Sequence, residues 1–268
     1  SDKEDCIMFQ EEHQVFSPPA ALVDTPTHFC PGCHHGIVHR LVAEALDRLC
    51  VVQDTICVAS VGCSVFIYNY LHVDAVEAPH GRAAAVATGV KRARPEAVVF
   101  TYQGDGDLAA IGLSEIMYTA NRGENMTVVF VNNTVYGMTG GQLAPTTMVG
   151  QKTTTSQQGR RFETDGAPLR MAEIIAGLSG TIYSARVAVD TVKHIKQARK
   201  VLVKGFANQL EKRGFSFVEF LSSCPTNWRL SPLEANERVQ AELIPYFPLG
   251  VYKDQKDGDL DAASRRAE

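Results

Sequence analysis

The stretch that decides the fold is Ala97-Val98-Val99-Phe100-Thr101-Tyr102-Gln103-Gly104-Asp105-Gly106-Asp107, or AVVFTYQGDGD over residues 97–107. Its first six residues are apolar, β-branched or aromatic, a pattern typical of a strand buried on both faces. The strand pattern stops at a glycine–aspartate turn, and apolar residues at helical spacing follow over residues 108–121. A buried strand, a glycine-rich turn and a helix in this order indicate an α/β fold with a parallel sheet.

The same alternation repeats on both sides of this stretch. Short apolar runs predict strands, and apolar residues at helical spacing predict helices. The predicted strands cover residues 55–60, 97–102, 126–132, 181–187 and 215–221, and the predicted helices cover 34–49, 81–94, 108–121, 169–178 and 192–210. We therefore expect an α/β fold, one doubly wound parallel sheet in a domain over residues 30–250, with an N-terminal arm (1–29) and a C-terminal tail (251–268).

Composition excludes several classes of function. Hydrophobic residues make up 45% of the chain and charged residues 21%, which is the ordinary balance of a globular protein. The net charge of −4 provides no basic field for nucleic acid or anionic lipid. No apolar run approaches the roughly 18 residues that span a bilayer, and the opening Ser1–Asp5 lacks the apolar core of a signal peptide. We expect a cytoplasmic protein with no nucleic-acid partner and no membrane span.

Unusual residues follow four of the predicted strands. The turns read VGCS, GDGD, NNTVYGMTGG and SSCP, at residues 61–64, 104–107, 132–141 and 222–225. Ligands of a doubly wound sheet bind beyond the carboxyl ends of its strands. We therefore expect one site, built from these four turns, along one edge of the sheet.

Two of these turns carry oxygen ligands for a metal ion. Asp105 offers a carboxylate, Asn133 an amide oxygen one βα unit later, and Val135 a backbone carbonyl just beyond. Together with diphosphate and water oxygens, these groups can complete the octahedron that Mg²⁺ requires, while Gly104 and Gly106 let the backbone approach a ligand closely. Gly-Asp-Gly alone would favour an ordinary turn. The two motifs together favour the metal site, and they resemble the thiamine diphosphate signature of Gly-Asp-Gly followed by Asn-Asn.

The seven cysteines are an odd number, which argues against a disulfide framework. Cys30 and Cys33 form a Cys-Pro-Gly-Cys motif, and Cys63 and Cys224 both follow predicted strands. Four thiolates suit either Zn²⁺ or an iron–sulfur cluster, and a neighbouring diphosphate–Mg²⁺ site favours electron transfer. A redox dithiol at Cys30 and Cys33 is disfavoured because no strand pattern precedes it.

The remaining three cysteines have other interpretations. Cys50 falls at a helix end and Cys57 inside a strand, and we interpret both as buried packing residues. Cys6 lies in the N-terminal arm and has no evident partner.

Six motifs in one order make the resemblance specific. They are FCPGCHHGI, SVGCS, HGRAAAVATG, GDGDLAAIG, NNTVYGMTGGQLAPTT and SSCPTNW, spread over roughly residues 25–250. This pattern resembles the short, thiamine diphosphate-binding β subunit of 2-oxoacid:ferredoxin oxidoreductases. The resemblance implies a [4Fe–4S] cluster on Cys30, Cys33, Cys63 and Cys224, and Mg²⁺ on Asp105, Asn133 and Val135. It also implies thiamine diphosphate contacts from Val61, Gly62, Ser64, His80, Gly104, Gly106, Asp107, Gly137 and Met138.

The implied activity is oxidative decarboxylation of a 2-oxoacid with coenzyme A, giving acyl-CoA and CO₂ while electrons pass through the cluster to ferredoxin. His80 and Met138 are then the candidate catalytic residues, with Met138 as the apolar prop beneath the bent cofactor. The alternative is that Met138 is ordinary core. We also expect cofactor and cluster to lie close together, because Cys63 belongs to the turn that would contact thiamine diphosphate.

The sequence departs from the family pattern at two positions. His34 stands where many members carry glycine, and we interpret it as a solvated residue at a helix start. Phe66 stands where some relatives that use small or dicarboxylic oxoacids have Lys or Arg. An aromatic ring cannot pair with a distal carboxylate, so we predict a branched-chain or other apolar substrate such as 2-oxoisovalerate. The alternatives are that Phe66 is core, and that 2-oxoglutarate is the substrate.

The resemblance also implies partner subunits. Thiamine enzymes need a glutamate against the aminopyrimidine ring, and the resemblance implies that a separate α subunit supplies it. We therefore expect the isolated chain to be inactive, and expect γ and ferredoxin-like δ subunits in addition. Arg82, at a helix start, is expected to bind a phosphate or a partner. The segment 140–168, with Lys152 and Arg160-Arg161, is expected to cover the site or dock a partner.

Two competing interpretations remain open at the level of the sequence. A non-redox thiamine decarboxylase or synthase would leave the four strand-edge thiols unexplained. A zinc-stabilised, non-catalytic binding module would reduce Gly-Asp-Gly to a turn. Metal analysis separates these possibilities, because iron with acid-labile sulfide indicates electron transfer and stoichiometric zinc indicates a structural role.

Overall fold

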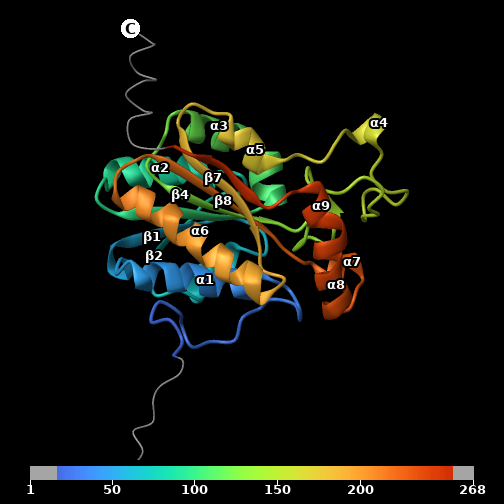
Figure 1. Cartoon of the computed structure of the whole chain (residues 1–268), viewed down its shortest axis with the longest axis horizontal. Coiled ribbons are helices and arrows are strands. Elements are labelled where there is room, and N and C mark those ends of the chain that lie inside the picture. The colour runs from blue at the N-terminus through green and yellow to red at the C-terminus, as the bar shows by residue number, and fades with distance from the viewer. Residues whose placement is uncertain (1–16, 256–268) are drawn as a thin grey trace, which may run out of the picture.

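A seven-stranded sheet forms the centre of the molecule (Figure 1). The structure is a computed structural model, and it describes residues 17–255. The strand order is β2-β1-β3-β4-β8-β7-β9. The strands are β1 (Thr55–Ala59), β2 (Asp74–Glu77), β3 (Val98–Gly104), β4 (Thr127–Asn132), β7 (Thr181–Ala188), β8 (Phe215–Leu221) and β9 (Gly250–Asp254). All neighbouring pairs are parallel except β7 and β9. The expected doubly wound, mostly parallel sheet is confirmed.

Helices cover both faces of the sheet, in two layers that are visible in Figure 1. One layer holds α1 (His35–Arg48) and α6 (Val192–Leu210), and the other holds α2 (Ala83–Ala93), α3 (Leu113–Asn121) and α5 (Met171–Ala176). Alternate residues of a strand serve the two layers, because side chains point to opposite faces. In β3, Phe100 packs in the α1/α6 layer and Val99 in the α2/α3/α5 layer. This double burial explains why the strands read as continuous apolar runs.

The two edge strands are the elements that the sequence analysis missed. All four residues of β2 are exposed, so the strand has no apolar run to reveal it. Strand β9 pairs antiparallel with β7 and takes up residues 250–254. The expectation of a tail from residue 251 is therefore wrong for residues 251–254, whose side chains are half-buried or exposed and carry no strand pattern. Residues 256–268, and residues 1–16 with Cys6, lie outside the described part.

The helix expected over residues 108–121 is divided at Gly112. A wide π turn, η3 (Gly106–Ile111), precedes α3, and the backbone N–H of Gly112 donates to the carbonyl of Asp107 at 2.8 Å. A Cβ on Gly112 would lie 2.5 Å from the carbonyl oxygen of Gly81. The absence of a side chain at Gly112 therefore lets the His80–Gly81 loop pack directly over the turn that follows β3.

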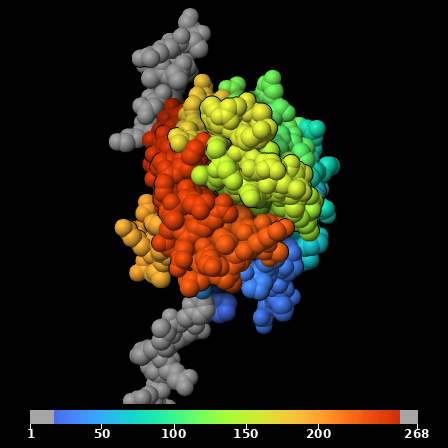
Figure 2. Space-filling view, turned by 90° about the vertical axis from the view of Figure 1, so that its right-hand side faces the viewer, coloured from blue at the N-terminus to red at the C-terminus, as the bar shows by residue number. Residues whose placement is uncertain are grey.

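Segments that follow β4 and β8 cover the carboxyl ends of the strands (Figure 2). The first segment, between β4 and β7, contains a hairpin of β5 (Val135–Tyr136) and β6 (Gln142–Leu143) and the short helix α4 (Phe162–Asp165). The second segment follows β8 and contains four short helices: α7 (Pro225–Trp228), α8 (Pro232–Arg238), η4 (Val239–Leu243) and α9 (Ile244–Tyr246). The last four pack around Trp228 and Phe247 in an apolar cluster that also includes Val135, Ala188 and Leu221. Short 3₁₀ turns, η1 (Val52–Asp54) and η2 (Val65–Asn69), flank β1. None of the described helices is long and apolar enough to cross a membrane.

Candidate active site and thiol cavity

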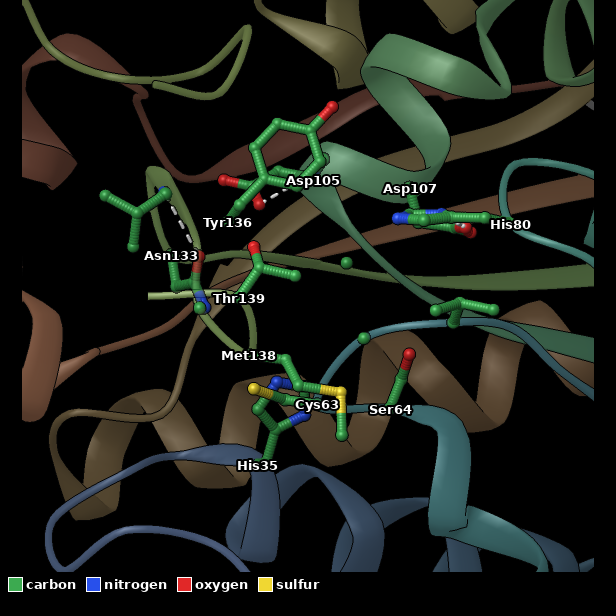
Figure 3. A pocket seen from close by; sticks show the side chains of 16 residues that line it. His35, Cys63, Ser64, His80, Asp105, Asp107, Asn133, Tyr136, Met138 and Thr139 are labelled. Carbon is green, nitrogen blue, oxygen red and sulfur yellow. Dashed lines mark hydrogen bonds and ion pairs between the residues drawn. The ribbon is translucent and has the colours of Figure 1, made fainter. Parts of the chain in front are cut away.

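Residues from the turns after β1, β3 and β4 surround one pocket at the carboxyl edge of the sheet (Figure 3). The pocket is lined by every residue predicted to contact thiamine diphosphate or Mg²⁺, namely Val61, Gly62, Ser64, His80, Gly104, Asp105, Gly106, Asp107, Asn133, Val135, Gly137 and Met138, together with Cys63. The same pocket is also lined by His35, Tyr136 and Thr139, which were not predicted as site residues. We call this the cofactor pocket.

Asp105 lies at the base of the cofactor pocket and is 2% exposed. Its Oδ1 accepts from the backbone N–H of Gly106 at 2.8 Å, and its Oδ2 accepts from Thr146 Oγ1 at 2.5 Å. Burial raises the pKa of this carboxyl to about 7, because few water molecules remain to solvate the anion. A divalent cation would supply the missing countercharge, so Asp105 fits the expected magnesium ligand.

The turn after β4 is strained and is held in place by the segment 140–168. Thr134 has φ +62, a conformation that β-branched residues rarely adopt. Its carbonyl accepts from Thr147 Oγ1 at 2.6 Å and from Gln151 Nε2 at 3.3 Å. The strained turn sets Asn133 and Val135 into the lining of the same pocket as Asp105. The oxygen donors predicted for Mg²⁺ are therefore gathered at one place.

The carboxylate of Asp107 accepts hydrogen bonds from four groups of the protein. Oδ1 accepts from His80 Nδ1 at 2.5 Å, Ser60 Oγ at 2.8 Å and the Gly81 N–H at 2.6 Å, and Oδ2 accepts from Gln103 Nε2 at 2.5 Å. Asp107 is 2% exposed, so its main effect is on the groups around it. It fixes the His80 ring with Nδ1 toward the carboxylate and leaves Nε2 available to the pocket, which the ring lines. Figure 3 shows the two side chains in contact.

A second cavity, of about 320 Å³, lies beside the cofactor pocket and is lined by Cys30, Cys33, Cys63 and Cys224. We call it the thiol cavity. Burial is the main cause that raises the pKa of Cys33 and of Cys63 to about 12, and repulsion from the neighbouring cysteines acts in the same direction. Four thiols around one cavity suit a bound cationic centre, because metal coordination deprotonates a thiol. Among residues 17–255, no three Cys, His, Asp or Glu side chains already surround a single ion position.

The Cys-Pro-Gly-Cys turn contacts Pro232 and Ser223, the residue before Cys224. Gly32 has φ +78, and a Cβ there would lie 2.5 Å from Cβ of Pro232. Its carbonyl accepts from Ser223 Oγ at 2.6 Å. A glycine between the two cysteines therefore lets the turn pack against α8, next to the residue that precedes Cys224.

His34 is buried at 5% exposure, so the interpretation as a solvated residue is wrong. Its Nδ1 accepts from the backbone N–H of Ser223 at 3.3 Å, and its Nε2 lies 3.1 Å from Asn236 Oδ1. Burial lowers the pKa of His34, consistent with a neutral ring. The ring joins the start of α1 to the segment that carries Cys224, a distant contact that its place in the sequence did not indicate.

The cofactor pocket and the thiol cavity share a wall, made by His35, Cys63, Asn133, Gly137 and Met138. A Cβ on Gly137 would lie 3.2 Å from Cys63 Sγ and 3.7 Å from Cys224 Sγ, so the bare glycine backbone lies directly against the sulfurs. Met138 is 47% exposed, which rules out its alternative interpretation as ordinary core. In Figure 3 it lies beside Cys63.

Four other residues that the sequence singled out, namely Phe66, Arg82, Cys50 and Cys57, line neither cavity. Phe66 lines neither, and its ring packs edge-on against His28 at 5.0 Å between centroids. Arg82 forms an ion pair with Glu115 of α3. Cys57 is buried as expected, but Cys50 is exposed; it adopts a left-handed conformation just after α1 and turns outward.

Arg160 organises the segment 140–168. Its guanidinium donates to backbone carbonyls on both sides of the segment, those of Ala144, Pro145, Thr147, Asp165, Gly166 and Ala167. Through Thr146 the segment reaches Asp105, so it forms part of the site. Thr146 lies in the last part of the NNTVYGMTGGQLAPTT motif, and its position in the sequence does not indicate the contact with Asp105.

Comparison with known protein families identifies the class of protein to which this domain belongs. Residues 60–220 match the family described as thiamine pyrophosphate enzyme, C-terminal TPP binding domain. This fold and the pocket at its carboxyl edge thus define a thiamine diphosphate-binding domain.

Individual relatives narrow the class. The chain is 45% identical over 243 residues to ketoisovalerate oxidoreductase subunit VorA of Methanothermobacter thermautotrophicus, covering 91% of this chain and 51% of that protein. It is 40% identical to 2-oxoglutarate synthase subunit KorB of Methanocaldococcus jannaschii, covering 88% of this chain and 84% of that one. The chain therefore belongs to the family of 2-oxoacid:ferredoxin oxidoreductase subunits. It spans about half the length of the ketoisovalerate relatives.

A solved structure agrees with this membership. The 2-oxoglutarate:ferredoxin oxidoreductase from Magnetococcus marinus, with 2-oxoglutarate, coenzyme A and succinyl-CoA bound, superposes with a TM-score of 0.73 at 26% identity. The match covers 96% of this chain and 91% of that chain.

Proposed function

We propose that this chain is the thiamine diphosphate-binding β subunit of a 2-oxoacid:ferredoxin oxidoreductase. The complex would oxidatively decarboxylate a 2-oxoacid with coenzyme A, giving acyl-CoA and CO₂ and passing electrons to ferredoxin. The observation that carries the proposal is the shared wall: Cys63 lines both the cofactor pocket and the thiol cavity. A chain that only bound thiamine diphosphate, or only bound zinc, would not need to place one cysteine against both.

In this proposal Asp105, Asn133 and the carbonyl of Val135 would hold Mg²⁺, and through it the diphosphate. The glycines Gly104 and Gly106 would let the backbone approach the diphosphate, and the Val61–Ser64 turn and Gly137 would contact the rest of the cofactor. When bound, thiamine diphosphate supplies the nucleophilic carbon that attacks the keto group of the substrate. The chain's own residues position that group and exclude water around it.

His80 and Met138 are the residues that we assign next to the reacting atoms. Asp107 accepts the Nδ1 proton of His80, so Nε2 is left to accept or return a proton at the pocket. Met138 presents an apolar side chain to the same pocket from the shared wall, where it would support the bent cofactor. Asp107 then acts by positioning His80 rather than by contacting the cofactor with its carboxylate.

The four thiols of the thiol cavity would hold a [4Fe–4S] cluster. Cys33, Cys63 and Cys224 are largely buried, and desolvation raises the pKa of each thiol. Without a metal centre, these thiols are protonated and poorly solvated; with one, each sulfur is a ligand. Free thiols of this kind persist in reducing compartments, which supports a cytoplasmic location.

We propose an apolar 2-oxoacid, such as 2-oxoisovalerate, as the substrate. Among the described residues, the linings of the two cavities are apolar, neutral polar, imidazole and acidic, and include neither Lys nor Arg. A second substrate carboxylate would therefore lack a cationic partner from this chain. The relative at 45% identity is named for ketoisovalerate, and the one at 40% for 2-oxoglutarate.

The test is anaerobic purification of the tagged chain with its partners. We expect co-purifying α, γ and ferredoxin-like δ subunits, bound thiamine diphosphate, Mg²⁺, and iron with acid-labile sulfide. The complex should reduce ferredoxin with 2-oxoisovalerate and coenzyme A, and the chain alone should not, because the glutamate that contacts the aminopyrimidine ring would come from the α subunit. Stoichiometric zinc without iron would refute the cluster. Preference for 2-oxoglutarate would refute the apolar substrate and leave the rest intact.

A further inference from the structure

His35 belongs to the FCPGCHHGI motif and lines both cavities, yet the resemblance to the family gives it no role. It is the first residue of α1, two positions after Cys33, and it lines both the cofactor pocket and the thiol cavity. Figure 3 shows its ring next to Cys63 and Met138. Its backbone N–H also bonds to the Cys33 sulfur. The residue is thus in contact with the region where the proposed cluster would lie.

The hydrogen bond between His35 and Tyr102 defines which ring nitrogen carries the proton. Nδ1 of His35 lies 2.7 Å from the Tyr102 hydroxyl, which is fully buried in β3. No other acceptor for that hydroxyl proton lies within the described residues. If Nδ1–H donated instead, the tyrosine proton would be buried without a partner, at a cost of about 1–3 kcal/mol. Tyr102 therefore donates, Nδ1 accepts, and the imidazole proton sits on Nε2.

The ring lines both cavities, and its Nε2 edge is not among the sealed polar atoms of the described core. Nε2 of His35 has no partner within residues 17–255, yet it is not sealed in the core. By contrast, both ring nitrogens of His39, one helical turn further on, are sealed without a partner. Phe29 stacks on the His35 ring with centroids 4.9 Å apart and planes at 11°, which fixes the ring plane. His35 thus presents a fixed N–H donor to the shared wall.

We propose that His35 donates a hydrogen bond from Nε2 to a sulfur of the iron–sulfur cluster and thereby raises the reduction potential of that cluster. The inference rests on the proposed function, because it needs the cluster. Reduction adds negative charge to the cluster sulfurs, so a donor stabilises the reduced form more than the oxidised form. His35 is a positioning and tuning residue in this proposal, and Tyr102 fixes its tautomer.

The experiment is an anaerobic redox titration of the purified complex, followed by EPR, on four variants. His35→Phe and His35→Leu remove the donor and should shift the midpoint potential to a lower value. His35→Gln can place an amide N–H near the former Nε2 and should retain a potential closer to the wild type. His39→Phe is the matched control, because His39 belongs to the same aromatic cluster and lines neither cavity. It should leave the potential unchanged.

The iron and sulfide content, measured first, distinguishes a failure of the proposed function from a failure of the role proposed for His35. A wild-type complex without iron and sulfide would refute the proposed function itself. A wild-type cluster whose potential is unchanged in His35→Phe or His35→Leu would refute only the role of His35. If neither apolar variant retains iron, the tuning role is rejected in favour of a structural one. In the metal-free chain, nitrogen NMR should find the Nε2–H tautomer of His35, and the Nδ1–H tautomer would contradict the proposal.

Discussion

Thr146 Oγ1 donates a hydrogen bond of 2.5 Å to Asp105 Oδ2 across 41 residues of sequence. The contact joins the segment 140–168 to the residue that we assign as the central magnesium ligand. Contacts of this kind orient a carboxylate toward its metal, and their removal reduces metal affinity. The segment is therefore coupled to cofactor binding as well as covering the site.

Thr146→Val should test that coupling. The substitution keeps the shape of the side chain and removes the donor, so the affinity for Mg²⁺–thiamine diphosphate should fall by about 10-fold or more. The measurement is a cofactor titration of the complex at fixed Mg²⁺, read by calorimetry. Thr154→Val is the control, because Thr154 is exposed and lies outside the cofactor pocket. Equal affinity in wild type and Thr146→Val would show that Asp105 needs no such support.

Asp107→Asn should disturb the orientation of His80. The amide cannot accept from all four donors that now surround the carboxylate, so the His80 ring should lose its fixed tautomer. We expect kcat to fall by about 100-fold, with iron content and cofactor affinity nearly unchanged. Asp190→Asn provides a matched comparison, because Asp190 bonds to His194 at 2.6 Å outside both cavities. An Asp107→Asn enzyme with full kcat would exclude the proposed role of His80.

His34→Ala should weaken the proposed cluster site selectively. The ring bridges Ser223 and Asn236, and its loss would leave buried polar groups unpaired at a cost of about 1–3 kcal/mol. Because Ser223 precedes Cys224, the fourth thiol should move away from Cys30 and Cys33. We expect less iron per chain in His34→Ala, whereas the exposed His72→Ala should retain it. Full iron content in both variants would contradict this account.

Arg160→Lys should loosen the segment 140–168. A lysine cannot satisfy the six carbonyls that Arg160 now satisfies, so the segment should become sensitive to limited proteolysis. Cofactor affinity should fall as well, since Thr146 and Thr147 belong to this segment. Arg161→Lys should behave like the wild type, because Arg161 is exposed. Similar cleavage of the two variants would argue against a special role for Arg160.

Stability should depend on pH through His39. Burial lowers the pKa of His39 well below 6.5, so the folded chain keeps the ring neutral while the unfolded chain binds a proton below pH 6.5. The free energy of unfolding should be highest above that pH and should fall in acid by about 1.4 kcal/mol per pH unit for this group. Urea unfolding of the metal-free chain measures the slope. The free energy of unfolding of His39→Phe should fall less steeply as the pH is lowered. Equal slopes in the variant and the wild type would contradict this role of His39.

The sequence predicted the inner elements of the fold well, for a physical reason. Strands such as β3 and β4 are buried on both faces, so apolar, β-branched and aromatic residues fill most of their positions and the pattern is plain. The same reason explains the failures. Strand β2 is exposed along its length, and β9 is stabilised by pairing with β7 rather than by its own side chains. Neither strand has a local pattern that separates it from a loop.

The residues of the candidate site also fall into two groups: those that the sequence indicated and those that it did not. Asp105, Asn133 and the four cysteines stand at strand ends or in a recognisable motif, so their type and spacing were enough to propose ligands. Thr146, His34 and His35 act through contacts with residues far away in the sequence. Such contacts are defined only when the turn at Gly32 packs on Pro232 and the segment 140–168 folds over β4. The residue type at one position, taken alone, could not indicate these contacts.

The two outer strands of the sheet determine where other chains can attach. Both β2 and β9 are short, and their charged residues include Asp74 and Glu77 on one side and Lys253 and Asp254 on the other. Two copies meeting edge to edge along β2 would bring like charges together and leave little backbone to pair. The β2 edge of the described sheet therefore resists pairing with a second copy, which guards against aggregation.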